Sequence, residues 1–155
     1  MLYALNRWDD AIIHYKKAID INPNFTEAFF NMGITYQSQA LFEKAIESYE
    51  NAVKLQPGFY EAIGNIGTIK QLQGDLDNAI KYFEKALNIN EDGRGHYNLA
   101  GALRNHGSLS IAIVHYKKAI ELNTNEPEFY SDLGDALWHD GQIKEANKFL
   151  RLAVK

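Results

Sequence analysis

The sequence repeats itself about every 34 residues, and this period limits the folds open to the chain. The clearest marker is an alanine that recurs at steps of 34, 34, 33 and 34, namely Ala18, Ala52, Ala86, Ala119 and Ala153. A fixed period in this range is typical of stacked supersecondary units, each packing on its neighbours, and not of one closed core. We therefore expect a repeat protein.

When the repeat is numbered from Thr26 as position 1, the other recurring residues fall at the same positions in each repeat. An apolar residue followed by a small one stands at positions 7 and 8: Met32-Gly33, Ile66-Gly67, Leu99-Ala100 and Leu133-Gly134. Position 20 is always small: Ala11, Ala45, Ala79, Ala112 and Ala146. Position 24 is aromatic at Tyr15, Tyr49, Phe83 and Tyr116, with Leu150 as a departure. Position 32 is Pro23 or Pro57, from which Glu91 and Thr124 depart.

In this pattern the sequence resembles the tetratricopeptide repeat (TPR) family from end to end. The resemblance implies an all-α fold, a right-handed α-solenoid of antiparallel helix pairs that forms a TPR superhelix. It also implies that the first helix of each pair lines a concave groove. A fold of this kind says little about the partner, because function depends on the site that the fold carries.

The repeat period predicts a single array over residues 1–155. Its parts are a partial repeat at 1–25, complete repeats at 26–59, 60–92 and 93–126, and an incomplete repeat at 127–155. The expected helices lie near Glu27–Gln39, Glu43–Leu55, Tyr60–Gln73, Asp77–Ile89, Arg94–His106, Ser110–Leu122, Pro127–Asp140 and Lys144–Val154. In the partial repeat we expect the end of a first helix and then a second helix, which stops at Pro23.

Glycines give further expectations about turns and packing. Gly74 and Gly107 fall between paired helices, where a left-handed residue is often needed. The small residues at positions 8 and 20 are expected to let two helix backbones approach closely. The joint Asn90–Gly95 is one residue short, lacks the proline and contains two glycines. Because glycine is costly to order, we expect the stack to bend at this joint.

At the otherwise apolar position 11, Lys70 is expected to bury its stem and extend its amine to water.

Composition and charge exclude several classes of function. A net charge of −4 argues against a nucleic-acid binder, which needs a basic face. The chain has no cysteine and therefore no disulfide or thiolate metal site. No apolar run approaches the roughly 20 residues that span a membrane, and Met1–Leu5 lacks the features of a signal peptide. We expect an intracellular, cytoplasmic protein that binds neither nucleic acid nor membrane.

The sequence shows no constellation of catalytic residues. Its glycines are scattered at repeat positions and do not form a phosphate-binding loop. None of the five histidines forms an HxxxH pair; His14 and His115 share position 23 and are expected to be solvated or partly packed. We therefore expect no catalytic residue, no metal site and no cofactor.

The informative positions are those that would line the groove. Position 6 is Asn31, Asn65, Asn98 and then Asp132. An asparagine can both donate to and accept from an extended peptide backbone, so one in each unit could form a ladder. The series resembles the asparagine ladder in the superhelical TPR region of O-GlcNAc transferases. The alternative is that asparagine is simply common at this position of the family.

Other groove positions could give selectivity. Phe30, Tyr97 and Trp138 offer aromatic surface, and Arg94 and Arg104 are expected to make the third repeat locally basic. The alternative is ordinary solvated helix surface.

These features favour a non-enzymatic scaffold that binds an extended peptide or protein segment in its groove. Two alternatives stay open: the substrate-recognition arm of a larger enzyme such as a glycosyltransferase, or a structural block in a large assembly. Neither end has a polar capping helix, so self-association through the ends is a further expectation.

Overall fold

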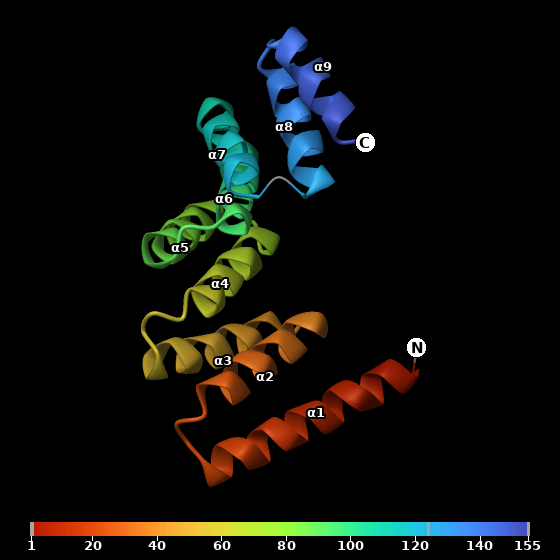
Figure 1. Ribbon diagram of the computed structural model, residues 1–155. Helices are drawn as coiled ribbons and strands as arrows, with labels where there is room; N and C mark the ends of the chain where they lie inside the picture. The colour runs from red at the N-terminus through yellow and green to blue at the C-terminus, as the bar shows by residue number, and fades with distance from the viewer. Residues whose placement is uncertain (1, 124, 155) are drawn as a thin grey trace. The chain divides into compact units, whose positions relative to one another are not determined.

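The computed structural model describes residues 2–123 and 125–154, and for residues 2–6 it describes the backbone alone. In this part of the chain the residues form α-helices and no strand (Figure 1). The helices are α1 (Leu2–Ile21), α2 (Thr26–Ser38), α3 (Phe42–Leu55), α4 (Tyr60–Leu72), α5 (Leu76–Ile89), α6 (Gly93–Asn105), α7 (Leu109–Leu122), α8 (Pro127–His139) and α9 (Ile143–Leu152). The chain is an all-α helical-repeat solenoid, which confirms the predicted fold class. The side chains of Met1–Leu5, predicted to form an exposed end, and Thr124 lie outside the described residues.

The helices form two compact units, residues 1–69 (unit 1) and residues 70–155 (unit 2). In unit 1, α2 packs against α3, and α1 packs against α2. In unit 2, the pairs α6–α7 and α8–α9 are linked by packing of α5 on α6 and of α7 on α8. The boundary between the units falls inside α4.

One helix differs from its prediction. The sequence led us to expect the end of a first helix and then a second helix in residues 1–25, but α1 is a single helix from Leu2 to Ile21. No proline or glycine interrupts this segment, so nothing in its backbone chemistry stops the helix before Asn22-Pro23. No helix in the described part of the chain is both long and apolar enough to cross a membrane.

The small residues at positions 8 and 20 make room for packing, though not in the way that was expected. Ala45, Ala79, Ala112 and Ala146 have no exposed surface. A Cβ atom built on Gly33 would lie 2.6 Å from Cε1 of Tyr49, and one built on Gly134 would lie 2.6 Å from Cγ of Leu150. The glycine at position 8 therefore admits the side chain at position 24 of the same helix pair, and not primarily a second backbone.

The paired helices turn at position 15 of each repeat. Gly74, Gly107 and Gly141 have φ angles of 78°, 92° and 79°, which confirms the left-handed turns predicted at the first two. Ala40 occupies the same position with a φ of 57°. Lys70 is half-buried, and its Nζ atom lies 3.8 Å from Oδ2 of Asp75. The expectation that its amine extends to water stays a prediction.

The joint between α5 and α6 contains a helix cap. Asp92 caps α6, because one of its carboxylate oxygens accepts a hydrogen bond from the Gly95 amide at 2.6 Å. A Cβ on Gly93 would lie 2.9 Å from the Ala119 carbonyl oxygen, and one on Gly95 would lie 2.8 Å from Cδ2 of Leu87. Both glycines therefore lie inside the first turn of a helix that packs closely on its neighbours. The bend expected at this joint stays a prediction.

Candidate functional site

Two helices of unit 2, α6 and α8, carry a connected group of aromatic and charged side chains. Tyr97 on α6 donates a hydrogen bond from its hydroxyl to Oδ2 of Asp132 on α8, at 2.7 Å. Its ring stacks on Phe129 with the ring centroids 4.5 Å apart and the planes 18° from parallel. Burial raises the pKa of the Tyr97 phenol, and the hydrogen bond to Asp132 raises it further, so the hydroxyl keeps the proton that it donates. Tyr97 and Asp132 are therefore held in place before any ligand arrives.

Both arginines of α6 are already paired. Arg94 forms ion pairs with Glu128 and, at 3.4 Å, with Glu126. Its guanidinium group also lies over the rings of Tyr97 and Phe129. Arg104 pairs with Asp135 of α8 and donates a hydrogen bond to the Tyr116 hydroxyl.

Carboxylates offset the local basic character expected of the third repeat. Glu126, Glu128 and Asp135 pair with the two guanidinium groups, and Asp132 accepts the hydrogen bond from Tyr97. The cluster holds an excess of two negative charges, because helix α8 and the residue before it supply more acidic groups than α6 supplies basic ones.

Four of the residues predicted for the groove meet at one pocket of unit 2. The pocket has a volume of about 240 Å³ and is lined by Gln71, Tyr97, Asn98, Gly101, Arg104, Asn105, Tyr116 and Asp132. At Gly101 a Cβ would make only ordinary contacts, with Nε2 of Gln71 at 3.6 Å and the Tyr116 hydroxyl at 3.9 Å. The half-buried Asn98 makes no side-chain hydrogen bond within the described residues. Its amide can therefore bind a ligand without first breaking an internal bond.

The equivalent residues of unit 1 are engaged differently. The Asn65 amide hydrogen-bonds the Tyr49 hydroxyl, which in turn donates to Oε1 of Gln37 at 2.7 Å. Burial raises the pKa of Tyr49, and the bond from Asn65 opposes that rise. The Phe30 ring packs on Phe59 and Tyr49, with centroids 4.7 and 5.7 Å apart. Asn65 and Phe30 are thus tied into the packing of unit 1, and both are half-buried.

The remaining predicted residues lie apart from these contacts. Asn31 on α2 is half-buried, and no side-chain hydrogen bond of its amide occurs in the described part of the chain. Trp138 is 51% exposed near the end of α8 and does not line the pocket.

The sequence analysis missed a link between neighbouring repeats. A tyrosine hydroxyl at position 24 contacts position 12 of its own repeat, as Tyr49 contacts Gln37 and Tyr116 contacts Arg104. In unit 1 the same hydroxyl also reaches position 6 of the next repeat, Asn65. Phe83 has no hydroxyl to offer Asn98, and this is why the Asn98 amide is left free. The choice of tyrosine or phenylalanine at position 24 is the signal in the sequence that could have shown that Asn65 is hydrogen-bonded and Asn98 is free.

No group of three or more histidine, aspartate or glutamate side chains in the described residues is placed to hold a metal ion. The pocket of unit 2 offers amide, hydroxyl and carboxylate groups, which suit hydrogen bonding to a polar chain.

Comparison with known proteins gives one consistent result. Three family models match: TPR repeat over residues 1–39, and Tetratricopeptide repeat over residues 26–59 and again over residues 60–125. No curated protein matches the sequence.

Among solved structures, the chain is similar to the crystal structure of MamA. The two are 27% identical with a TM-score of 0.86, over 98% of this chain and 90% of that chain. It also resembles PilF of Pseudomonas aeruginosa, at 19% identity and a TM-score of 0.89, over 98% of this chain and 70% of that chain. YrrB, described as a TPR protein with an unusual peptide-binding site, is 19% identical with a TM-score of 0.76, over 99% of this chain and 79% of that chain. The likenesses to PilF and YrrB are evidence of a shared fold.

Proposed function

Because the chain belongs to the tetratricopeptide repeat family, whose members are generally non-catalytic protein-interaction scaffolds, we propose that it binds an extended peptide segment of a partner protein. The proposed contact surface is the pocket of unit 2. The observation that carries the proposal is the free amide of Asn98, which lines the same pocket as the internally paired side chains of Tyr97 and Arg104. YrrB, which shares the fold, is described as having a peptide-binding site, so the fold is compatible with this use.

Asn98 suits a peptide backbone because its amide can donate to a carbonyl and accept from an N–H group. Gln71 and Asn105 line the same pocket and offer the same pair of functions. A hydrogen bond of this kind contributes about 1 kcal/mol net, since it replaces a bond to water. The site would thus hold a chain through its backbone, with little demand on the sequence of that chain.

Charge supplies a preference among peptides. The excess of two carboxylates on α8 and the residue before it favours a segment that carries lysine or arginine. Because these groups are half-buried or exposed, their attraction is screened by salt and affects the association rate more than the final affinity. We therefore expect binding to weaken as ionic strength rises.

The proposal can be tested with peptides selected from a displayed library of random dodecamers against the whole chain. The selected peptides are then titrated against the wild type, Asn98→Ala and a matched control, Asn147→Ala, whose asparagine is exposed on α9. Loss of about 1 kcal/mol corresponds to a decrease in affinity of roughly fivefold. We expect that decrease for Asn98→Ala alone, with thermal melting unchanged in both variants. Equal affinity of all three proteins would contradict the proposal.

A further inference from the structure

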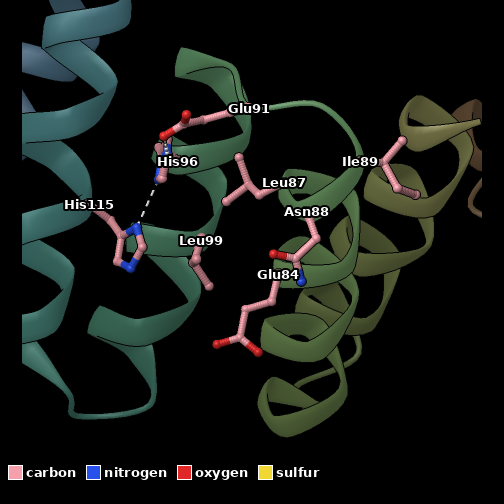
Figure 2. Close-up of a pocket in the computed structure, with 8 residues that line it drawn as sticks. All are labelled: Glu84, Leu87, Asn88, Ile89, Glu91, His96, Leu99 and His115. Carbon is pink, nitrogen blue, oxygen red and sulfur yellow. Dashed lines mark hydrogen bonds and ion pairs between the residues drawn. The ribbon is translucent and has the colours of Figure 1, made fainter. Parts of the chain in front are cut away.

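Unit 2 contains a second pocket, which the proposed function does not use. It has a volume of about 570 Å³ and lies between α5, the connection to α6, and helices α6 and α7. Figure 2 shows its lining residues, and a dashed line in it marks the contact between the imidazole rings of His96 and His115. The residues are Glu84, Leu87, Asn88, Ile89, Glu91, His96, Leu99 and His115.

The two imidazoles are in direct contact. Nδ1 of His96 lies 2.9 Å from Nδ1 of His115, and the rings are 5.1 Å apart at 26°. His96 is buried, with 8% of its surface exposed, and His115 is half-buried. On the far side of the His96 ring, Nε2 lies 3.2 Å from Oε1 of Glu91.

These contacts fix where the protons are. An ionised carboxylate can only accept, so His96 must carry its proton on Nε2 and donate it to Glu91. Nδ1 of His96 is then an acceptor, and the hydrogen bond between the rings requires a proton on Nδ1 of His115. The result is a chain of donors from His115 to His96 to Glu91, in which both imidazoles are neutral.

From this chain we propose that the His96–His115 pair is an acid-sensitive latch between α6 and α7. The pair can take one extra proton on Nε2 of His115, the ring nitrogen that is not bonded to His96. A second proton has to occupy Nδ1 of His96, where it meets the Nδ1–H of His115 at 2.9 Å. Two imidazolium rings with N–H groups pointing at each other repel, so full protonation breaks this one contact between helices that also share an apolar core.

The other charged groups around the two histidines do not remove the repulsion between the doubly protonated rings. Glu84 faces the pocket from α5, and Glu91 faces it from the connection between α5 and α6. Glu91 is shared, because Nζ of Lys118 on α7 lies 3.8 Å from the same oxygen that contacts His96. Burial lowers the pKa of His115, and the neighbouring His96 lowers it further.

The sign of the effect on stability follows from proton counting. In the unfolded chain each histidine takes up a proton near its ordinary pKa of about 6.5. The folded pair binds fewer protons at the same pH, because the pKa of His115 is depressed and the second site is blocked. This contribution to folding is therefore complete above pH 6.5 and is lost as the pH falls below that value.

The first test is an NMR titration of the histidine ring protons in the whole chain. The reference is the ordinary histidine pKa of about 6.5. We expect His115 to titrate below that value and to move toward it in the variant His96→Gln. Titration of His115 at the ordinary value in the wild type would overturn the proposal. The titration of His115 in the wild type is decisive by itself, so this test works even if the variant does not fold.

The second test compares urea unfolding midpoints at about pH 7.5 and about pH 5.5, an interval above the range in which ordinary carboxylates titrate. The proteins are the wild type, His115→Gln and the control His14→Gln. A glutamine at 115 can donate to His96 or accept from it, so it tolerates a protonated His96. We expect the midpoint to fall with pH in the wild type and in His14→Gln, and to fall less in His115→Gln. An equal fall in all three proteins would refute the latch.

Discussion

At the scale of single residues, two glycines of unit 1 carry opposite constraints although both lie inside helices. A Cβ on Gly33 would strike the Tyr49 ring at 2.6 Å, whereas a Cβ on Gly64 would meet nothing within 4 Å. We expect Gly33→Ala to lower the free energy of unfolding by about 1–3 kcal/mol, since a buried tyrosine must move. Gly64→Ala should raise it by up to about 1 kcal/mol, because alanine is the better helix former. Urea denaturation of the two variants beside the wild type measures both effects, and a similar change in both would contradict the packing described for Gly33.

The asparagines at position 6 show how far the sequence could be read at this scale. The repeat period correctly placed Asn31, Asn65 and Asn98 at equivalent sites, all of them half-buried on the first helix of a pair. It could not show that Asn65 is bound by a tyrosine hydroxyl while Asn98 is free. A repeat period identifies which residues are equivalent. The hydrogen-bond partner of each asparagine depends instead on whether position 24 of the preceding repeat carries a hydroxyl, as Tyr49 does and Phe83 does not. The role of these asparagines in a peptide ladder stays a prediction.

At the scale of elements, the start of α6 is stabilised by an N-cap residue, Asp92, which the sequence did not predict because the joint is rich in glycine. The sequence favours a loose segment at residues 90–95, but Asp92 accepts from the Gly95 amide, and the Asn90 side chain donates to Asp92 at 3.2 Å. Removing an N-cap side chain typically costs about 1 kcal/mol. We therefore expect Asp92→Ala to destabilise the chain by that amount and to speed hydrogen exchange at the Gly95 amide.

The control for this cap is Asp77→Ala, which removes an exposed carboxylate from the first turn of α5 that caps no amide. Hydrogen exchange followed by mass spectrometry should show no change at Gly95 in this variant. Rapid exchange at Gly95 in the wild type, at the rate of an unprotected amide, would show that the joint is loose after all.

At the scale of the whole molecule, the recurrence of the repeat predicted the order and type of the helices from α2 to α9. It did not predict that α1 is continuous, because the expected break copied the repeat pattern onto a segment with no helix-breaking residue. Nor did it predict that contacts group the helices into residues 1–69 and 70–155. Periodicity treats every repeat as equal, whereas packing density depends on the particular side chains at each contact.

The final prediction concerns self-association through exposed apolar side chains at α9. Leu152 and Val154 are 38% and 85% exposed, and such groups on a protein surface often mark interfaces. We expect the average mass measured by sedimentation equilibrium to rise with protein concentration, and the rise to disappear in Val154→Glu. Val114→Glu, at a valine 63% exposed on α7, is the matched control and should associate like the wild type. Leu150 is unsuitable for this purpose, because its side chain covers Gly134 inside the α8–α9 pair and a charge there would disrupt the fold. A wild type that keeps the mass of one chain at every concentration would rule out α9 as a contact between copies.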